Sequence, residues 1–133
     1  MRAFRDNLVF SNYQVNSICD EIYNLVKGIE VPEPMLLLTG LAAYFLQRGT
    51  DHRPLNNVIF TTSNIDVYNE LILNINQLGV LNILKYDNRI LFEGKAQFQT
   101  VYFEIWLDPV ATESVDINGV FCQRYNLIKT ELL

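Results

Sequence analysis

The stretch RPLNNVIFTT, residues 53–62, joins polar side chains to the start of an apolar strand. Asn56 and Asn57 stand directly before the apolar run 58–60, a place that holds carboxylates in many metal-dependent enzymes. Asparagine is also common in turns, because its side chain hydrogen-bonds to the local backbone. Two interpretations follow: a binding site that lacks the charges of a metal site, or a turn that enters a core strand.

A glycine and two arginines form a second group of candidates. Gly40 separates the apolar run 35–39 from the helix-forming block 41–46. A glycine at such a place lets backbone N–H groups approach a phosphate, or it simply allows a tight strand-to-helix turn. Arg48 and Arg53 flank a short loop and could hold a phosphate, although ordinary surface charges would look the same.

Glu104 is the third candidate. In the strand pattern around it, Val101, Phe103 and Ile105 point to one face, whereas Glu104 and Trp106 point to the other. A carboxylate on the more polar face of a strand can ligate a metal ion, or it can simply remain solvated. Both interpretations stay open from this pattern alone.

Other reactive residues indicate little chemistry. His52 is the one histidine of the chain and has no cysteine or histidine at a metal-ligand spacing. Cys19 and Cys122 lie far apart in apolar patterns, so we expect buried free thiols. No serine lies in a nucleophile-elbow pattern, which gives no support to a serine hydrolase.

The elements that must position these residues follow from hydrophobic periodicity. Helices are predicted over residues 13–28, 41–46, 64–78 and 125–133, and strands over residues 58–62, 81–86, 89–92 and 99–107. The apolar run 35–39 is consistent with a buried strand or with the lead-in to the next helix. Ser63 or Asn64 is expected to cap helix 64–78, whose apolar face includes Val67 and Leu71. Asp87 with Asn88, and Asn118 with Gly119, are typical of turns. This order indicates one mixed α/β domain, residues 1–133, with a sheet of about four to six strands flanked by helices.

Composition limits the classes of function. A formal net charge of −5 and a pI near 4.7 argue against an extended nucleic-acid surface, since phosphate binding requires clustered lysine and arginine. The apolar run 35–38 is far shorter than the roughly 20 residues of a membrane helix. Residues 1–7 do not resemble a secretory signal, so a cytoplasmic protein without a membrane partner is expected.

Two segments resemble the minimal nucleotidyltransferases found among abortive-infection toxins and related bacterial proteins. LTGLAAYFLQRGTDHRPLNNVIF, residues 38–60, is similar to the family's strand, glycine turn, helix, arginine-containing loop and second strand. INGVFCQRYNLIKTELL, residues 117–133, is similar to a later glycine turn, short strand and helix. In this family three carboxylates, two on the second strand and one on a later strand, hold two Mg²⁺ ions beside a nucleotide.

Carried over by position, the resemblance implies a kept scaffold without the metal site. Asn57 and Ile59 stand at the first two carboxylate positions, and Glu104 stands at the third. A register one residue earlier would place Asn56 and Val58 there, with the same result. Asparagine carries no formal charge and isoleucine or valine has no side-chain oxygen, so two of the three expected carboxylates are absent. No metal site and no ordinary Mg²⁺-dependent nucleotide transfer are expected.

The resemblance also marks four residues for contacts to a nucleotide. Thr39 and Gly40 stand at the glycine turn, where two glycines or glycine and serine are usual. Arg53 matches the arginine of the loop, and Arg48 lies at the start of the same loop. These positions are candidates for nucleotide binding without catalysis.

The resemblance therefore implies a catalytically inactive, nucleotidyltransferase-like protein of a bacterium, which acts as a binding or interaction module and needs no cofactor. Its partner would be another protein, a second copy of the chain, or a nucleotide. One alternative is an active nucleotidyltransferase that binds Mg²⁺ and a nucleoside triphosphate through Glu104 together with Asp51, Asp66 or Asp108. The other alternative is a purely structural or oligomer-forming domain.

Overall fold

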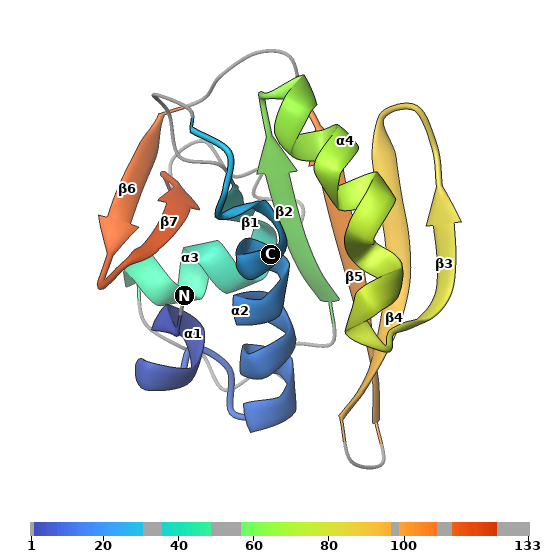
Figure 1. Ribbon diagram of the computed structural model, residues 1–133. Coiled ribbons are helices and arrows are strands. Elements are labelled where there is room, and N and C mark those ends of the chain that lie inside the picture. The colour runs from blue at the N-terminus through green and yellow to red at the C-terminus, as the bar shows by residue number, and fades with distance from the viewer. Residues whose placement is uncertain (1, 31–35, 49–56, 97–98, 109–112, 125–133) are drawn as a thin grey trace.

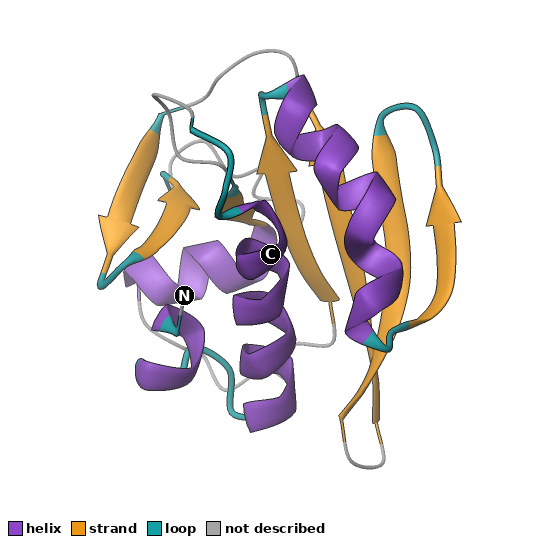
Figure 2. Ribbon diagram, in the orientation of Figure 1, coloured by secondary structure: helices purple, strands orange, loops and turns teal. Residues whose placement is uncertain are grey.

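A computed structural model describes residues 2–30, 36–48, 57–96, 99–108 and 113–124. In this part of the chain, helices and strands are interspersed up to Leu78, and five strands follow one another from Leu81 onward (Figures 1 and 2). The helices are α1 (Ala3–Asp6), α2 (Tyr13–Val26), α3 (Gly40–Arg48), α4 (Ile65–Asn74) and the 3₁₀ helix η1 (Ile75–Leu78). The strands are β1 (Leu37–Thr39), β2 (Asn57–Thr62), β3 (Leu81–Lys85), β4 (Arg89–Ala96), β5 (Gln99–Leu107), β6 (Ser114–Ile117) and β7 (Val120–Gln123).

The strands form one mixed sheet in the order β3-β4-β5-β2-β1-β7-β6. Two pairs, β2 with β5 and β1 with β7, are parallel, and the other four pairs are antiparallel. The predicted mixed α/β class is thus confirmed. The described residues contain seven strands rather than four to six, because the short pair β6 and β7 extends the sheet beyond β1.

Helix α2 is amphipathic, as predicted, and packs on one face of the sheet. The Asn12 side chain accepts a hydrogen bond from the backbone N–H of Gln14 and so caps the N-terminus of α2. The helix ends at Val26, two residues before the predicted end at Gly28. A Cβ atom on Gly94 of β4 would lie 2.8 Å from Cδ1 of Ile18, so the missing side chain lets α2 approach the sheet closely.

Helix α4 lies beside α2 on the same side of the sheet (Figure 1). Of the two predicted caps, Asn64 is the one used: its side-chain oxygen accepts from the backbone N–H groups of Asp66 and Val67. Val67 and Leu71 are fully buried, which confirms the predicted apolar face. The helical segment continues through η1 and ends at Gly79, which has a φ of 66°.

Both predicted turns connect neighbouring antiparallel strands. Asp87 and Asn88 lie between β3 and β4. Asn118 and Gly119 connect β6 to β7 with φ values of 53° and 91°, as a two-residue type I′ turn requires. The predicted helix 125–133 lies outside the described residues.

A buried ion pair fastens α1 to α2. The carboxylate of Asp20 is fully buried and accepts from the backbone N–H groups of Phe4 and Arg5, each at 3.0 Å. The same carboxylate pairs with Nε of Arg5 at 2.9 Å. Phe4 then packs against Phe60 of β2 with the ring centroids 6.0 Å apart. The Asp20 pair therefore holds the N-terminal helix against α2, from where the Phe4 ring reaches β2.

Strands β2 and β5 form the centre of the sheet and separate its two faces. Val58, Phe60, Phe103 and Ile105 are buried against the helices, and we call this side the core face. The opposite side, which carries Glu104 and the residues that alternate with the core residues, is called the second face below. Candidate residues on these two strands point to the second face.

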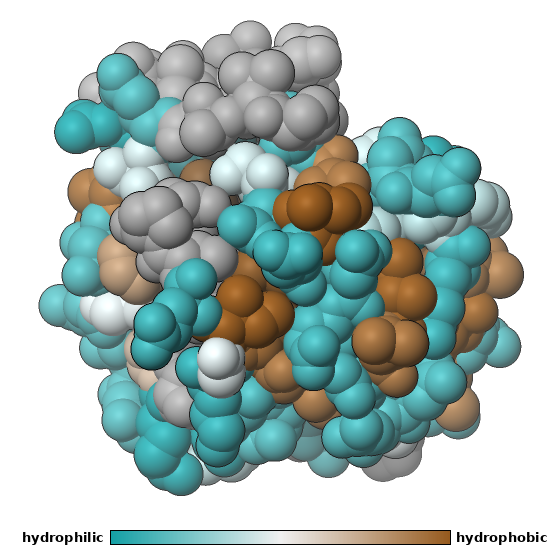
Figure 3. All heavy atoms as spheres, turned by 45° about the horizontal axis from the view of Figure 1, so that its top comes forward, coloured by the Kyte–Doolittle hydropathy of each residue, from teal (hydrophilic) through white to brown (hydrophobic). Residues whose placement is uncertain are grey.

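The surface on the side of the helices shows small apolar areas separated by polar residues (Figure 3). No helix in the described ranges is long and apolar enough to cross a membrane.

Candidate functional site

The parallel pairing of β2 with β5 brings together the three positions that the resemblance assigns to metal carboxylates. Ile59 is the register partner of Glu104, and Asn57 is the partner of Tyr102, the residue two positions earlier on the same face as Glu104. Asn57, Ile59 and Glu104 therefore share the second face of adjacent strands. The sequence resemblance predicted this grouping, although 45 or more residues separate Glu104 from the other two.

The Glu104 carboxylate accepts hydrogen bonds from two neutral donors. Nδ2 of Asn57 lies 3.3 Å from Oε2, and Nε1 of Trp106 lies 3.0 Å from Oε1. Each oxygen thus has one amide or indole N–H partner. At the position that the resemblance assigns to a metal carboxylate, Asn57 thus directs an N–H group, rather than an oxygen, at Glu104.

Ile59 packs against the glycine turn that follows β1. Gly40 has a φ of 70°, a left-handed conformation that favours glycine. A Cβ atom on Gly40 would lie 3.4 Å from Cδ1 of Ile59, so the two residues are in contact range. Thr39, the residue before the turn, is the register partner of Ile59. An aliphatic side chain therefore lies beside the turn that was predicted to approach a phosphate.

Thr39 is tied to the strand on the other side of β1. Its Oγ1 lies 2.5 Å from Oε1 of Gln123 on β7. Nε2 of Gln47 on α3 donates to the backbone oxygens of Gln123 and Ala43, at 2.7 and 3.0 Å. These contacts give Thr39 and Gln123 a structural role in joining α3, β1 and β7.

The described residues include only one of the two arginine candidates. Arg48 lies at the last position of α3 and is exposed. Arg53 lies outside the described residues, as do Asn56, Asp51 and His52. Predicted contacts of these residues to a nucleotide stay predictions.

The donor set around Glu104 does not fit a pair of Mg²⁺ ions. Magnesium prefers oxygen ligands in an octahedral arrangement at about 2.0–2.1 Å. Ile59 supplies no oxygen, and Asn57 presents its N–H group to Glu104. Among the residues that the structure describes, no three His, Cys, Asp or Glu side chains form a group that could hold a metal ion.

The two described acids of the alternative site lie away from Glu104. Asp66 belongs to the first turn of α4, which packs on the core face, whereas Glu104 points to the second face. Asp108 follows the end of β5, four residues after Glu104, which corresponds to about 13 Å along an extended chain. Neither acid is an immediate neighbour of Glu104 in this arrangement.

Aromatic residues beside Glu104 were only partly anticipated. Cζ of Arg89 lies 4.5 Å from the ring centroid of Tyr86 and 5.2 Å from that of Trp106. These distances are typical of cation–π contacts. Alternation along the strand had placed Trp106 on the face of Glu104. Arg89 and Tyr86 were missed, because they reach Trp106 only through the pairing of Arg89 with Trp106 across β4 and β5.

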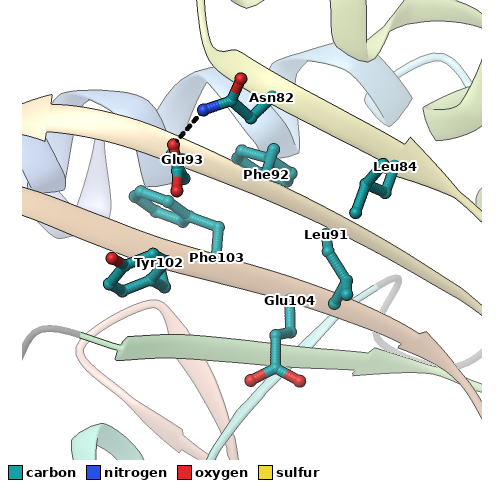
Figure 4. A pocket seen from close by; sticks show the side chains of 8 residues that line it. All are labelled: Asn82, Leu84, Leu91, Phe92, Glu93, Tyr102, Phe103 and Glu104. Atoms are coloured by element: carbon teal, nitrogen blue, oxygen red, sulfur yellow. Dashed lines mark hydrogen bonds between the residues drawn. The ribbon is translucent and has the colours of Figure 1, made fainter.

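A shallow groove of about 420 Å³ follows the second face from β3 to β5 (Figure 4). Its lining includes Asn82 and Leu84 of β3, Leu91 and Glu93 of β4, and Tyr102 and Glu104 of β5. A register irregularity in β3 between Leu81 and Leu84 accompanies the positive φ of Asn82, whose side chain donates to Glu93. Sequence alternation could have placed the β4 and β5 residues on one face, but not the groove itself.

Both cysteines are free and buried, as predicted. Burial, together with the nearby Asp116, raises the pKa of the Cys122 thiol to about 12. Burial and the adjacent Asp20 raise the pKa of the Cys19 thiol well above its ordinary value. Both thiols are therefore protonated at neutral pH and are not nucleophiles.

Comparisons with known proteins give one distant structural similarity. No protein-family model matches the chain, and no curated protein sequence matches it. A crystal structure described as that of "a putative nucleotidyltransferase" from Thermotoga maritima aligns over 83% of this chain and 77% of that chain, with a TM-score of 0.46 and 14% sequence identity. This chain is thus similar to that protein in outline only, and the similarity does not establish a family.

Proposed function

We propose that the protein is a catalytically inactive, nucleotidyltransferase-like binding module of a bacterial cytoplasm. One observation carries the proposal: the single described carboxylate at the resembling site, Glu104, is bonded to Asn57 and Trp106 instead of to further oxygen ligands. With Ile59 in register beside it, this arrangement favours a stable polar contact over the binding of two metal ions.

The second face supports a binding role rather than a purely structural one. Half of the Tyr102 side chain and half of the Leu84 side chain are exposed, although both residues belong to the sheet. They line the same groove as Glu104. Exposed aromatic and aliphatic side chains beside a concave surface are typical of a site that another molecule covers.

Calorimetric titration with ATP and with GTP, each with and without Mg²⁺, tests the inactive assignment. The wild-type protein is expected to show no Mg²⁺-dependent heat of binding and no release of pyrophosphate. Glu104→Gln is the informative variant, and Glu113→Gln, before β6 at the other edge of the sheet, is the matched control. Mg²⁺-dependent binding that Glu104→Gln abolishes and Glu113→Gln keeps would establish an active or metal-binding site instead.

Light scattering distinguishes the proposed binding module from a purely structural or oligomer-forming domain. A dimer that persists on dilution, together with a second face that binds no added molecule, would favour an oligomer-forming domain. A monomer under the same conditions is the expected result for a module that binds a different partner.

A further inference from the structure

The groove on the second face has an apolar centre and an acidic residue on each side. Leu84 and Leu91 face each other in register on β3 and β4. Leu91 in turn pairs with Glu104, and Glu93 pairs with Tyr102. The two glutamates are therefore diagonal neighbours on adjacent strands, about 7–8 Å apart at their Cα atoms.

The side chains of the two glutamates point away from each other. Glu93 is held toward Asn82 of β3, whereas the Glu104 carboxylate points toward β2 (Figure 4). Leu91 and the exposed ring of Tyr102 lie between them. Acidic groups thus mark opposite margins of the groove, and apolar and aromatic surface lies at its centre.

Neither glutamate forms an ion pair within the described ranges. Glu93 and Glu104 accept hydrogen bonds only from amide and indole N–H groups. The cations on the same row of β4 lie at its two ends: Arg89 is stacked on aromatic rings, and Lys95 is exposed. No ion pair within the described ranges therefore competes with a cationic partner for either carboxylate.

From this geometry we propose that the groove binds an extended segment of a partner protein that carries a basic residue on each side of an apolar residue. The proposal rests on the non-catalytic binding role given above and names the partner chemistry. In an extended segment, side chains two positions apart share one face at a spacing of about 6.6–6.8 Å. The pattern Arg-x-Leu-x-Arg would place leucine over Leu91 and one arginine toward each glutamate.

Charge favours such a partner over a second copy of the chain. Two grooves placed face to face would bring Glu93 and Glu104 of one copy against the same residues of the other, at a formal charge of −5 for each chain. The irregular β3 edge, with Asn82 in a left-handed conformation, also interrupts the regular ladder that strand addition needs.

The test uses two capped peptides of identical composition. Acetyl-Gly-Arg-Ser-Leu-Ser-Arg-Gly-amide presents both arginines on the face of its leucine, whereas acetyl-Gly-Ser-Arg-Leu-Arg-Ser-Gly-amide presents them on the opposite face when extended. Binding is followed by the fluorescence of Trp106, the one tryptophan of the chain, whose indole N–H contacts Glu104. Calorimetry gives the affinity independently.

The first peptide is expected to bind more tightly than the second. Glu93→Gln and Glu104→Gln should each weaken its binding by about 1.4- to fivefold, the range for an exposed ion pair. Glu113→Gln, which removes one charge at the far edge of the sheet, should leave the affinity unchanged. Raising NaCl from 0.05 to 0.5 M should weaken binding, because salt screens exposed charges.

Three results would overturn the proposal: no binding of either peptide, equal affinity for the two, or equal weakening by Glu113→Gln. Concentration-dependent self-association that Glu93→Gln strengthens would assign the groove to a second copy. A wrong partner class would appear in the peptide titrations alone. A wrong proposed function would appear as Mg²⁺-dependent nucleotide binding or turnover. Urea unfolding of each variant confirms that the glutamine substitutions keep the fold.

Discussion

Asn57→Asp tests the contact that distinguishes this site from a metal centre. Nδ2 of Asn57 lies 3.3 Å from Oε2 of Glu104, so the substitution places a second carboxylate beside the first. Two unit charges 4 Å apart repel by about 1 kcal/mol in water and by about 4 kcal/mol at an effective dielectric constant near 20. Asn57 is exposed and Glu104 is partly exposed, so the lower part of this range applies.

We expect Asn57→Asp to lower the free energy of unfolding by about 1–2 kcal/mol at pH 7 and low salt. With a urea dependence of about 1–3 kcal/mol per M, the unfolding midpoint should fall by about 0.3–2 M. The Asn57→Ala control removes only one exposed hydrogen bond and should cost less than about 1 kcal/mol. In 1 M NaCl, where the screening length is about 3 Å, the two variants should converge.

Equal stability of Asn57→Asp and Asn57→Ala at low salt would refute the contact. The same conclusion would follow if the Asn57→Asp deficit did not change with salt. Either result would mean that residue 57 and Glu104 do not face each other across β2 and β5.

Other predictions concern the framework that positions the site. Asp20→Ala removes the acceptor of the Phe4 and Arg5 backbone N–H groups and of Nε of Arg5, so urea unfolding should show a loss of about 2 kcal/mol or more in the free energy of unfolding, and a loss below about 1 kcal/mol would contradict the buried contacts. The buried thiols of Cys19 and Cys122 stay protonated at a pH where the thiols of the unfolded chain have ionised. The free energy of unfolding should therefore be full below about pH 9 and fall toward pH 12, by at most about 1.4 kcal/mol per pH unit for each thiol. Cys122→Ala should make this fall shallower, and an unchanged slope would contradict the prediction. Gly40→Ala forces alanine to a φ of 70° and should cost about 1–2 kcal/mol in the same unfolding assay, whereas wild-type stability would show that the turn is not left-handed.

Local patterns in the sequence predicted most elements of the fold. The alternation of Val101, Phe103 and Ile105 with Glu104 and Trp106 gave both the strand and its two faces, because one face of β5 is buried and the other is not. Strand β6 escaped prediction, because its four residues show neither clear alternation nor full burial. Its place in the sheet depends on the turn to β7 and on the pairing of β7 with β1.

The sequence predicted which residues of the candidate site lie together, but not the contacts that their side chains make. The resemblance placed Asn57, Ile59 and Glu104 together, and the parallel pairing of β2 with β5 brings them to one face. The hydrogen bond from Trp106 and the stacking of Arg89 depend on side-chain rotamers and on register between distant segments. A single sequence contains no local signal for either, nor for the groove that runs from β3 to β5.

The proposal that Glu104 binds no metal ion is tested most directly with Mn²⁺, a paramagnetic substitute for Mg²⁺. The indole Nε1–H of Trp106 lies 3.0 Å from Oε1 of Glu104 and belongs to the one tryptophan, so it gives one resolved signal in a ¹⁵N-labelled sample. We predict that this signal keeps its intensity when Mn²⁺ is added to one equivalent in the presence of ATP. Selective loss of the signal at that ratio, reversed by Glu104→Gln, would show a metal ion at the carboxylate and contradict the account.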